Sequence, residues 1–144
     1  MTEIVPLEKF HMEKLVHEDM NLMYIEQLYN EHLFTHPLSR AVLIDGEVMV
    51  VGGALEQWQG RAMLWMIFSE KSKMKFVTVF RAMKDLLKFY LNEFQRLETY
   101  MPADFYQAHR RAQLFGFSCE VRRSRKFFPS GQDGSIYSIC RGDL

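Results

Sequence analysis

The stretch IDGEVMVVGGA, residues 44–54, says most about how the chain folds. Asp45-Gly46 is a two-residue turn sequence that favours positive φ at both positions, so it predicts a β-hairpin. The turn separates two apolar runs, 41–44 and 48–55, which we expect to form the two strands. Gly52-Gly53 lies inside the second run, where glycine weakens a strand. We therefore expect a bulge or a close backbone approach at this pair.

On the C-terminal side, Gln59-Gly60 marks a second reversal and residues 62–68 return as a third strand. The segment 76–94 then predicts a long amphipathic helix, because its apolar residues recur at steps of three and four. We assign that apolar face to the core: Phe76, Val79, Phe80, Met83, Leu86, Leu87, Tyr90 and Phe94.

The rest of the chain contains further segments with the residue patterns of strands and of helices. A strand is expected at Ile4-Val5 before Pro6, then helices at about 7–18 and 21–32, the second on the stripe Leu22, Ile25, Leu28 and Tyr29. Towards the C-terminus we expect a strand at 97–101, a helix at 103–115 closed by Gly116, and strands at 118–121 and 136–140. The predicted order is β-α-α-β-β-β-α-β-α-β-β. It indicates an α/β (α+β) fold in which helices flank a mixed, mostly antiparallel sheet within a single domain, residues 1–144.

Composition limits the possible functions. The 144 residues are 48% hydrophobic, enough to build a core, and 18 Lys and Arg balance 18 Asp and Glu. Zero net charge gives no general attraction to nucleic acid or to an anionic membrane. The two cysteines, Cys119 and Cys140, have no spacing typical of a metal site, and their usage is typical of a reducing compartment. No run suits a signal peptide or a bilayer span, so we expect a cytoplasmic protein.

The segment FSEKSKMKF, residues 68–76, joins the third strand of the hairpin region to the long helix. It carries three alternating lysines, Lys71, Lys73 and Lys75, and it contains no glycine. The first backbone N–H groups of a helix lack internal partners and attract anions. A polar, cationic turn here therefore suggests a local anion site.

Taken with the predicted order of elements, IDGEVMVVGGA at 44–54 and AHRRAQLFGF at 108–117 resemble the GNAT superfamily of acyl-CoA-dependent N-acetyltransferases over nearly the whole chain. The resemblance implies acetyl-CoA as co-substrate and a primary amine of a small molecule or protein as acceptor. It also implies that the turn after the strand at 62–68, which is the fourth strand of the predicted order, binds the cofactor pyrophosphate. The end of that strand would lie beside the pantetheine arm. The corresponding residues are Met66, Ile67, Phe68, Ser69, Lys71, Ser72, Lys73, Met74, Lys75 and Phe76.

Two positions depart from the family pattern. The family's pyrophosphate loop usually reads Arg/Gln-x-x-Gly-x-Gly/Ala, whereas residues 69–75 have no glycine, and Glu70 adds a like charge to the anion. The family's general-acid tyrosine stands four residues before the glycine of Gly-Phe, which is Ala112 here, and its frequent asparagine falls at Phe105. Lysine side chains can supply the charge that glycine N–H groups would provide.

Amine acetylation needs a base for the ammonium proton and an acid for the leaving thiolate. Glu56 and Glu70 are the candidate bases, His36 is a candidate proton relay, and Tyr106 is the nearest tyrosine for the acid. Each also has a plainer interpretation: solvated surface acids for the two glutamates and a packing aromatic for the tyrosine. His109 is expected on the exposed face of its helix.

Other interpretations stay open. Ser69-x-Lys71-Ser72-Lys73-x-Lys75-Phe76 also resembles a GNAT-like phage group that includes the small internal virion protein of short-tailed coliphages. That likeness implies a catalytically inactive structural or interaction protein, with a homodimer or virion partner and a location in host cytoplasm or virion. Two basic clusters could face an adenine 3′-phosphate, an acidic partner or simply solvent. They are Arg110-Arg111 and the group Arg122, Arg123, Arg125 and Lys126. Nucleic-acid binding is poorly supported at zero net charge.

Overall fold

The computed structural model describes residues 1–15 and 36–144. The chain divides into two compact units: Met1–Leu55 with Leu64–Leu87, and Glu56–Met63 with Lys88–Leu144. The second predicted helix, at 21–32, lies outside the described residues, and so does the end of the first.

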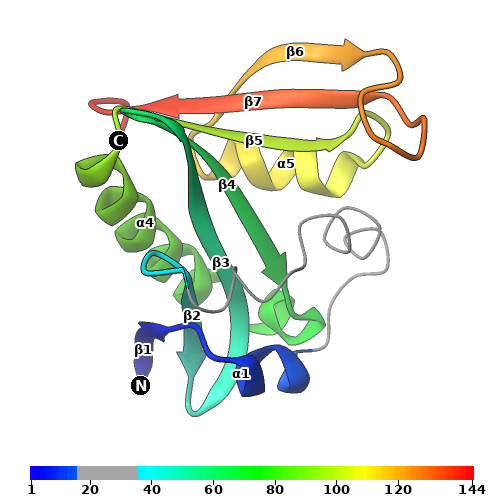
Figure 1. Ribbon diagram of the computed structural model, residues 1–144. Coiled ribbons are helices and arrows are strands. Elements are labelled where there is room, and N and C mark those ends of the chain that lie inside the picture. Colours follow the sequence, from blue (N-terminus) through cyan, green and yellow to red (C-terminus); the bar gives the residue numbers. More distant parts are fainter. Residues whose placement is uncertain (16–35) are drawn as a thin grey trace. The chain divides into compact units, whose positions relative to one another are not determined.

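The first unit contains β1 (Thr2–Pro6), α1 (Lys9–Lys14), β2 (Arg40–Ile44), most of β3 (Glu47–Trp58), and the end of β4 (Arg61–Phe68) (Figure 1). A 3₁₀ helix, η1 (Glu70–Lys75), follows β4 and leads directly into α4 (Phe76–Glu93). The predicted hairpin is confirmed: Asp45 and Gly46 have φ of 52° and 82°, and β2 and β3 pair antiparallel on either side of them. The strand at Ile4-Val5 extends over all of β1, which pairs antiparallel with β2.

Gly52 and Gly53 make the close approach that their position predicts. A Cβ on Gly52 would lie 2.6 Å from the carbonyl oxygen of Trp65, and a Cβ on Gly53 would lie 2.8 Å from both Ser39 Oγ and Trp65 Nε1. Both glycines are therefore required for packing. The register of this hairpin shifts instead at Met49 on β3, which is passed over between the pairs Val42–Val50 and Leu43–Val48.

The core of the first unit is a cluster of buried apolar side chains from α1, the strands and their flanking turns. Its members are Leu7, Leu15, Ala41, Val48, Val51, Trp65 and Ile67. Burial of each such side chain contributes about 1.5–3 kcal/mol relative to exposure. Most of the predicted core face of α4 is buried as well, namely Val79, Met83, Leu86, Leu87, Tyr90 and Phe94, whereas Phe76 is exposed.

The second unit contains β5 (Arg96–Pro102), α5 (Tyr106–Leu114), β6 (Ser118–Ser124) and β7 (Gly134–Cys140), and α5 runs along β5 and β7 in Figure 1. Gly116 has φ of 98° directly after α5, as expected for the residue that ends a helix. At the end of α4, the Arg141 side chain donates to the carbonyls of Leu91 (2.7 Å) and Asn92 (3.3 Å), which have no partner inside the helix.

The seven strands follow the order β1-β2-β3-β4-β5-β7-β6, so the expected mixed sheet is confirmed. The pairs β1–β2, β2–β3, β5–β7 and β6–β7 are antiparallel, and β4–β5 is parallel. The β4–β5 register covers three pairs, from Arg61 opposite Arg96 to Met63 opposite Glu98. Both strands continue beyond the last pair.

Candidate active site

The turn between β4 and α4 is a compact 3₁₀ helix rather than an open loop. Ser69 forms its N-cap: the backbone of Ser69 is extended and its Oγ accepts from Lys71 N at 3.1 Å. Ser72 N and Ser72 Oγ both donate to the Ser69 carbonyl, at 3.0 and 2.6 Å. Ser69 N donates to Met49 O on β3 at 2.8 Å.

This capping changes how the turn could bind an anion. The backbone N–H groups of Ser69, Lys71 and Ser72 already have acceptors inside the protein, and both serine side chains are buried. A glycine-rich loop would instead leave such groups free to close on phosphate. The charge available to an anion at this turn therefore comes from lysine side chains.

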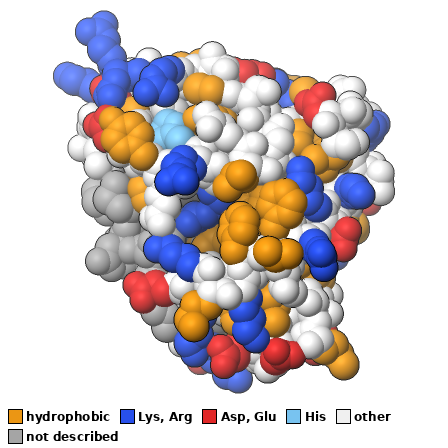
Figure 2. Space-filling view, turned by 180° about the vertical axis from the view of Figure 1, so that it is seen from behind, with side chains coloured by type: hydrophobic (Ala, Val, Ile, Leu, Met, Phe, Trp, Pro, Cys, Tyr) orange, Lys and Arg blue, Asp and Glu red, His pale blue; other side chains and the backbone are white. Residues whose placement is uncertain are grey.

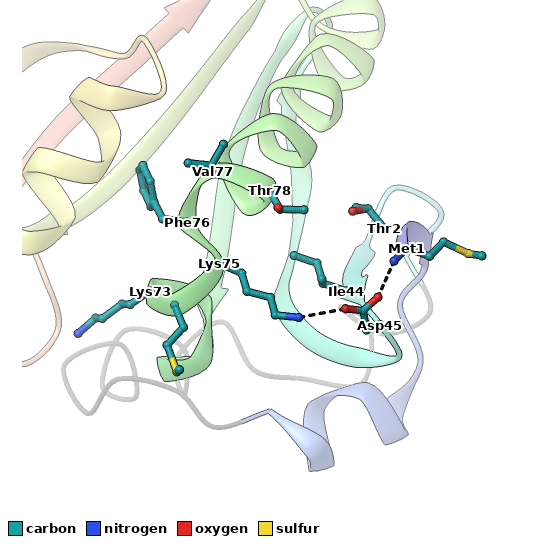
Figure 3. Close-up of a pocket in the computed structure, with 10 residues that line it drawn as sticks. Met1, Thr2, Ile44, Asp45, Lys73, Lys75, Phe76, Val77 and Thr78 are labelled. Atoms are coloured by element: carbon teal, nitrogen blue, oxygen red, sulfur yellow. Dashed lines mark hydrogen bonds and ion pairs between the residues drawn. The ribbon is translucent and has the colours of Figure 1, made fainter.

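The three lysines of the turn differ in their partners, and Figure 3 draws Lys73 and Lys75 among them. Lys75 Nζ lies 3.0 Å from Asp45 Oδ2, and Lys71 Nζ lies 3.3 Å from Glu47 Oε2. Lys73 points away from Asp45 in the close-up, and no carboxylate among the described residues pairs with it. Asp45 also accepts from the Met1 amino group at 2.5 Å. Because of the bonds from that amino group and from Lys75, the pKa of Asp45 is lowered to about 2.

A pocket of about 570 Å³ lies beside the turn. It is lined by Met1, Thr2, Ile44, Asp45 and residues 73–78, all in the first unit. Its rim is partly apolar: Met74 is 87% exposed, Val77 62% and Phe76 43%. A smaller pocket, about 210 Å³, is lined by Lys14, Lys71, Glu47 and the adjoining residues Gly46, Val48 and Ser69.

The remaining residues that the resemblance assigns to the cofactor, Met66, Ile67 and Phe68, lie at the end of β4. Ile67 and Phe68 are buried, and Ile67 belongs to the core of the first unit. Met66 is partly exposed, and its Cγ would lie 3.0 Å from a Cβ on Gly52. Within the described part of the chain, the register between β4 and β5 ends at Met63, before these residues are reached.

The four catalytic candidates divide between the units. His36 and Glu70 belong to the first unit, and Glu56 and Tyr106 to the second. Glu56 on β3 and Glu70 at the start of η1 are exposed, and Tyr106 at the start of α5 is 63% exposed, which excludes a buried packing role for its ring. His36 accepts from Leu38 N through Nδ1 at 3.2 Å, so in the neutral ring the proton is on Nε2.

The two positions at which the family usually has a tyrosine and an asparagine lie on α5 and at its N-cap. Ala112 is buried on α5, and Phe105 is the buried N-cap residue of the same helix. The prediction that His109 is exposed is wrong. His109 is 6% exposed and bridges two strands, with Nδ1 2.8 Å from the Tyr137 hydroxyl and Nε2 3.2 Å from Pro102 O. A carbonyl only accepts, so Nε2 carries the proton and Nδ1 accepts from Tyr137.

A charged network in the second unit was not expected from the sequence. Glu98 is buried and accepts from Arg61 Nη2 (2.7 Å), from Arg96 Nε (3.0 Å) and from the Tyr100 hydroxyl (2.9 Å). Burial acts to raise the pKa of Glu98, but these hydrogen bonds outweigh it and leave the pKa lowered. The alternating charges of RLETY are the only sequence cue, and they do not reveal burial.

Arg96 extends this network to β6. It donates to Glu120 at 2.8 and 2.6 Å, and Ser138 Oγ donates to the same carboxylate at 2.5 Å. The bonds from Arg96 and Ser138 lower the pKa of Glu120 to about 2.

Of the basic cluster at 122–126, Arg123 pairs with Asp104 and Asp133, both at 2.7 Å. Lys, Arg, Asp and Glu side chains also share the face drawn in Figure 2.

Residues 1–15 and 36–144 contain no group of three His, Cys, Asp or Glu side chains placed to hold a metal ion. No helix in that part of the chain is both long enough and apolar enough to cross a bilayer.

Comparisons by sequence and by structure give different results. No family model matches the sequence, and no curated protein matches it. Solved structures do match. A GNAT-family acetyltransferase from Bacillus anthracis has a TM-score of 0.75 at 17% identity, over 97% of this chain and 95% of that one. Ard1 from Thermoplasma volcanium gives 0.71 at 10% identity, over 96% and 97%.

A third match is a variant of the spermidine N-acetyltransferase SpeG from Vibrio cholerae, with a TM-score of 0.65 at 14% identity, over 97% of this chain and 94% of that one. These alignments cover nearly the whole chain, as the resemblance at 44–54 and 108–117 implies. At such low identity a structural match establishes the fold. The chain has the fold of the GNAT acetyltransferases.

Proposed function

We propose that the chain is an acyl-CoA-dependent N-acyltransferase that transfers an acetyl group from acetyl-CoA to a primary amine. The observation that carries the proposal is the short parallel register of β4 and β5, which ends at Met63 and Glu98 although both strands continue. A strand edge without a strand partner can pair with an extended ligand that bears amides. The pantetheine arm of acetyl-CoA is such a ligand, and residues 66–68 would receive it.

The lysine turn would hold the diphosphate. Its N–H groups at Ser69, Lys71 and Ser72 are bonded internally, so Lys73, with Lys71 and Lys75, would supply the positive charge. An ammonium group acts on phosphate as a mobile point charge and needs no close backbone approach. This assignment explains how the turn could work without glycine.

Chemistry would proceed by direct attack of the amine on the thioester in a ternary complex. Positioning of the two substrates and polarisation of the carbonyl would contribute most of the rate. Glu56 or Glu70 would take the ammonium proton, His36 would relay it, and Tyr106 would protonate the leaving thiolate. The exposure of Glu56, Glu70 and Tyr106 leaves these groups accessible to substrate.

The test is release of free CoA thiol from acetyl-CoA in the presence of polyamines, amino acids and peptide N-termini. Activity with one class of amine is expected. Lys73→Gln should raise the KM for acetyl-CoA about tenfold with little change in kcat, because a charged hydrogen bond is lost from binding. Lys88→Gln, an equal charge change on an exposed position of α4, should leave KM unchanged.

The internal bonding of the turn also favours a second candidate. A GNAT-fold protein in which the turn N–H groups of Ser69, Lys71 and Ser72 already have acceptors could serve as a structural or interaction protein, with a homodimer or virion partner. The exposed apolar side chains Met74, Val77 and Phe76 suit such a contact. Absence of thiol release with all amines, together with absence of acetyl-CoA binding, would favour this candidate.

A further inference from the structure

Two carboxylates of the β2–β3 turn form ion pairs with two of the three lysines on the turn that follows β4. Asp45 pairs with Lys75 at 3.0 Å and Glu47 pairs with Lys71 at 3.3 Å. Figure 3 shows the Lys75 side chain directed across the pocket to Asp45, while Lys73 points elsewhere. The two ion pairs therefore tie the β2–β3 turn to the turn after β4 in the first unit; Asp45 and Lys75 are 30 residues apart in the chain, and Glu47 and Lys71 are 24 apart.

The geometry of the β2–β3 turn fixes where these carboxylates lie. Asp45 is held at φ of 52°, a conformation that aspartate and asparagine tolerate better than most residues. Glu47 begins β3 immediately after Gly46, so the two carboxylates stand on either side of the turn glycine. The neighbouring β3 residue Met49 accepts from Ser69 N, which keeps the start of η1 against this strand.

We propose that Asp45 and Glu47 are internal competitors of a diphosphate: they hold Lys75 and Lys71 until a bound diphosphate displaces them. The inference rests on the proposed function, which supplies the diphosphate as part of acetyl-CoA. Because the N–H groups of Ser69, Lys71 and Ser72 are bonded internally, the lysines are the turn's main source of positive charge for the ligand.

The strength of the pairs suits a displaceable contact. All four side chains are more than two-fifths exposed, and exposed ion pairs are weak. A diphosphate brings more negative charge than either carboxylate, and lysine side chains are long enough to change partners. We therefore expect a diphosphate to displace these carboxylates more readily than a single acetate or chloride ion does.

The experiment measures the dissociation constants of acetyl-CoA and of inorganic diphosphate by titration calorimetry at low ionic strength. Glu47→Gln and Asp45→Asn should each tighten the binding of both ligands about two- to fivefold, and the double variant more than either. Asparagine at position 45 preserves the turn conformation. Glu3→Gln is the matched control, because Glu3 is an exposed carboxylate of the same unit, and it should leave both constants unchanged.

A double-mutant cycle identifies the contact responsible. In a Lys71→Gln background, Glu47→Gln should no longer tighten binding, because the lysine that it releases is gone. The proposal is overturned if Glu47→Gln and Asp45→Asn bind diphosphate no more tightly than Glu3→Gln does. Tighter diphosphate binding in these variants without acetyl-CoA binding in any of them would support the proposal and reject the acyltransferase function. Thermal melts of each variant confirm that the comparison is between folded proteins.

Discussion

Gly52 shows how a single missing Cβ shapes the first unit. A Cβ at this position would lie only 2.6 Å from the carbonyl oxygen of Trp65. That oxygen is a backbone atom, which cannot move aside as the end of a flexible side chain can. Gly52→Ala should therefore destabilise the protein by about 1–3 kcal/mol through overpacking. Urea unfolding measures the change. Gly131→Ala, where a Cβ meets nothing within 4 Å and only a positive φ is strained, should cost less; an equal cost would contradict the close approach.

Glu98 makes a second prediction at the residue scale. Glu98→Gln removes the charge that pairs with Arg61 and Arg96 while keeping the shape of the side chain. Because this carboxylate is buried and accepts hydrogen bonds from three side chains, the substitution should lower the free energy of unfolding by about 2–4 kcal/mol. Glu93→Gln, an exposed position at the end of α4, should change it by less than about 0.5 kcal/mol. Equal effects would mean that the network contributes nothing to stability.

At the scale of elements, α5 is fastened to β5 and β7 through His109. His109→Phe leaves the Tyr137 hydroxyl and Pro102 carbonyl without this partner and should cost about 1–3 kcal/mol. Adding Tyr137→Phe to His109→Phe should cost less than the same change in the wild-type background, since the hydroxyl has already lost its acceptor. Urea unfolding of the two single variants and the double variant gives the coupling free energy. A coupling near zero would contradict the hydrogen bond.

The sequence predicted elements better than it predicted side-chain partners. Asp45-Gly46 and Gly116 specify local backbone geometry, and both are where the turn chemistry places them. Periodicity located α4 to within a residue of its ends, but it could not show that Phe76 stays exposed. Glu98 and His109 look like surface residues in sequence because one decisive partner of each, Arg61 on β4 and Tyr137 on β7, is distant in the chain. Burial of a polar side chain depends on such contacts, which no local pattern contains.

The same limit applies to the candidate site. The absence of glycine between residues 69 and 75 is plain in the sequence, and the capping by Ser69 and Ser72 is not. Nor does the spacing of the lysines show that Lys71 and Lys75 pair with Glu47 and Asp45, which lie on another turn. The roles of Glu56, Glu70, His36 and Tyr106 stay predictions, because no observation brings them together.

For the whole molecule, acid should weaken folding in both units. The pKa of Asp45 in the first unit and that of Glu120 in the second are each lowered to about 2. A lowered pKa means that the charged form is favoured in the fold, so the stabilisation is present above the ordinary pKa and is lost as pH falls towards 2. The free energy of unfolding should therefore fall between about pH 4.5 and pH 2.

Urea unfolding at several pH values checks this dependence. Glu120→Gln and Asp45→Asn should each give a shallower fall than the wild-type protein over that range, because each removes one group that must be protonated. Glu3→Gln serves as the control, with a slope like that of the wild type. An unchanged slope in both test variants would contradict the assigned contacts of Arg96 with Glu120 and Lys75 with Asp45.

The central claim is that this GNAT fold binds acyl-CoA through a lysine turn, and thermal unfolding with acetyl-CoA tests it most directly. Ligand at about a hundred times its dissociation constant stabilises a folded protein by roughly 2.7 kcal/mol, which for a chain of this length is a shift of several degrees. We predict such a shift at millimolar acetyl-CoA, a smaller one with adenosine diphosphate, and a reduced one in Lys73→Gln. No shift with acetyl-CoA at any attainable concentration would contradict the claim.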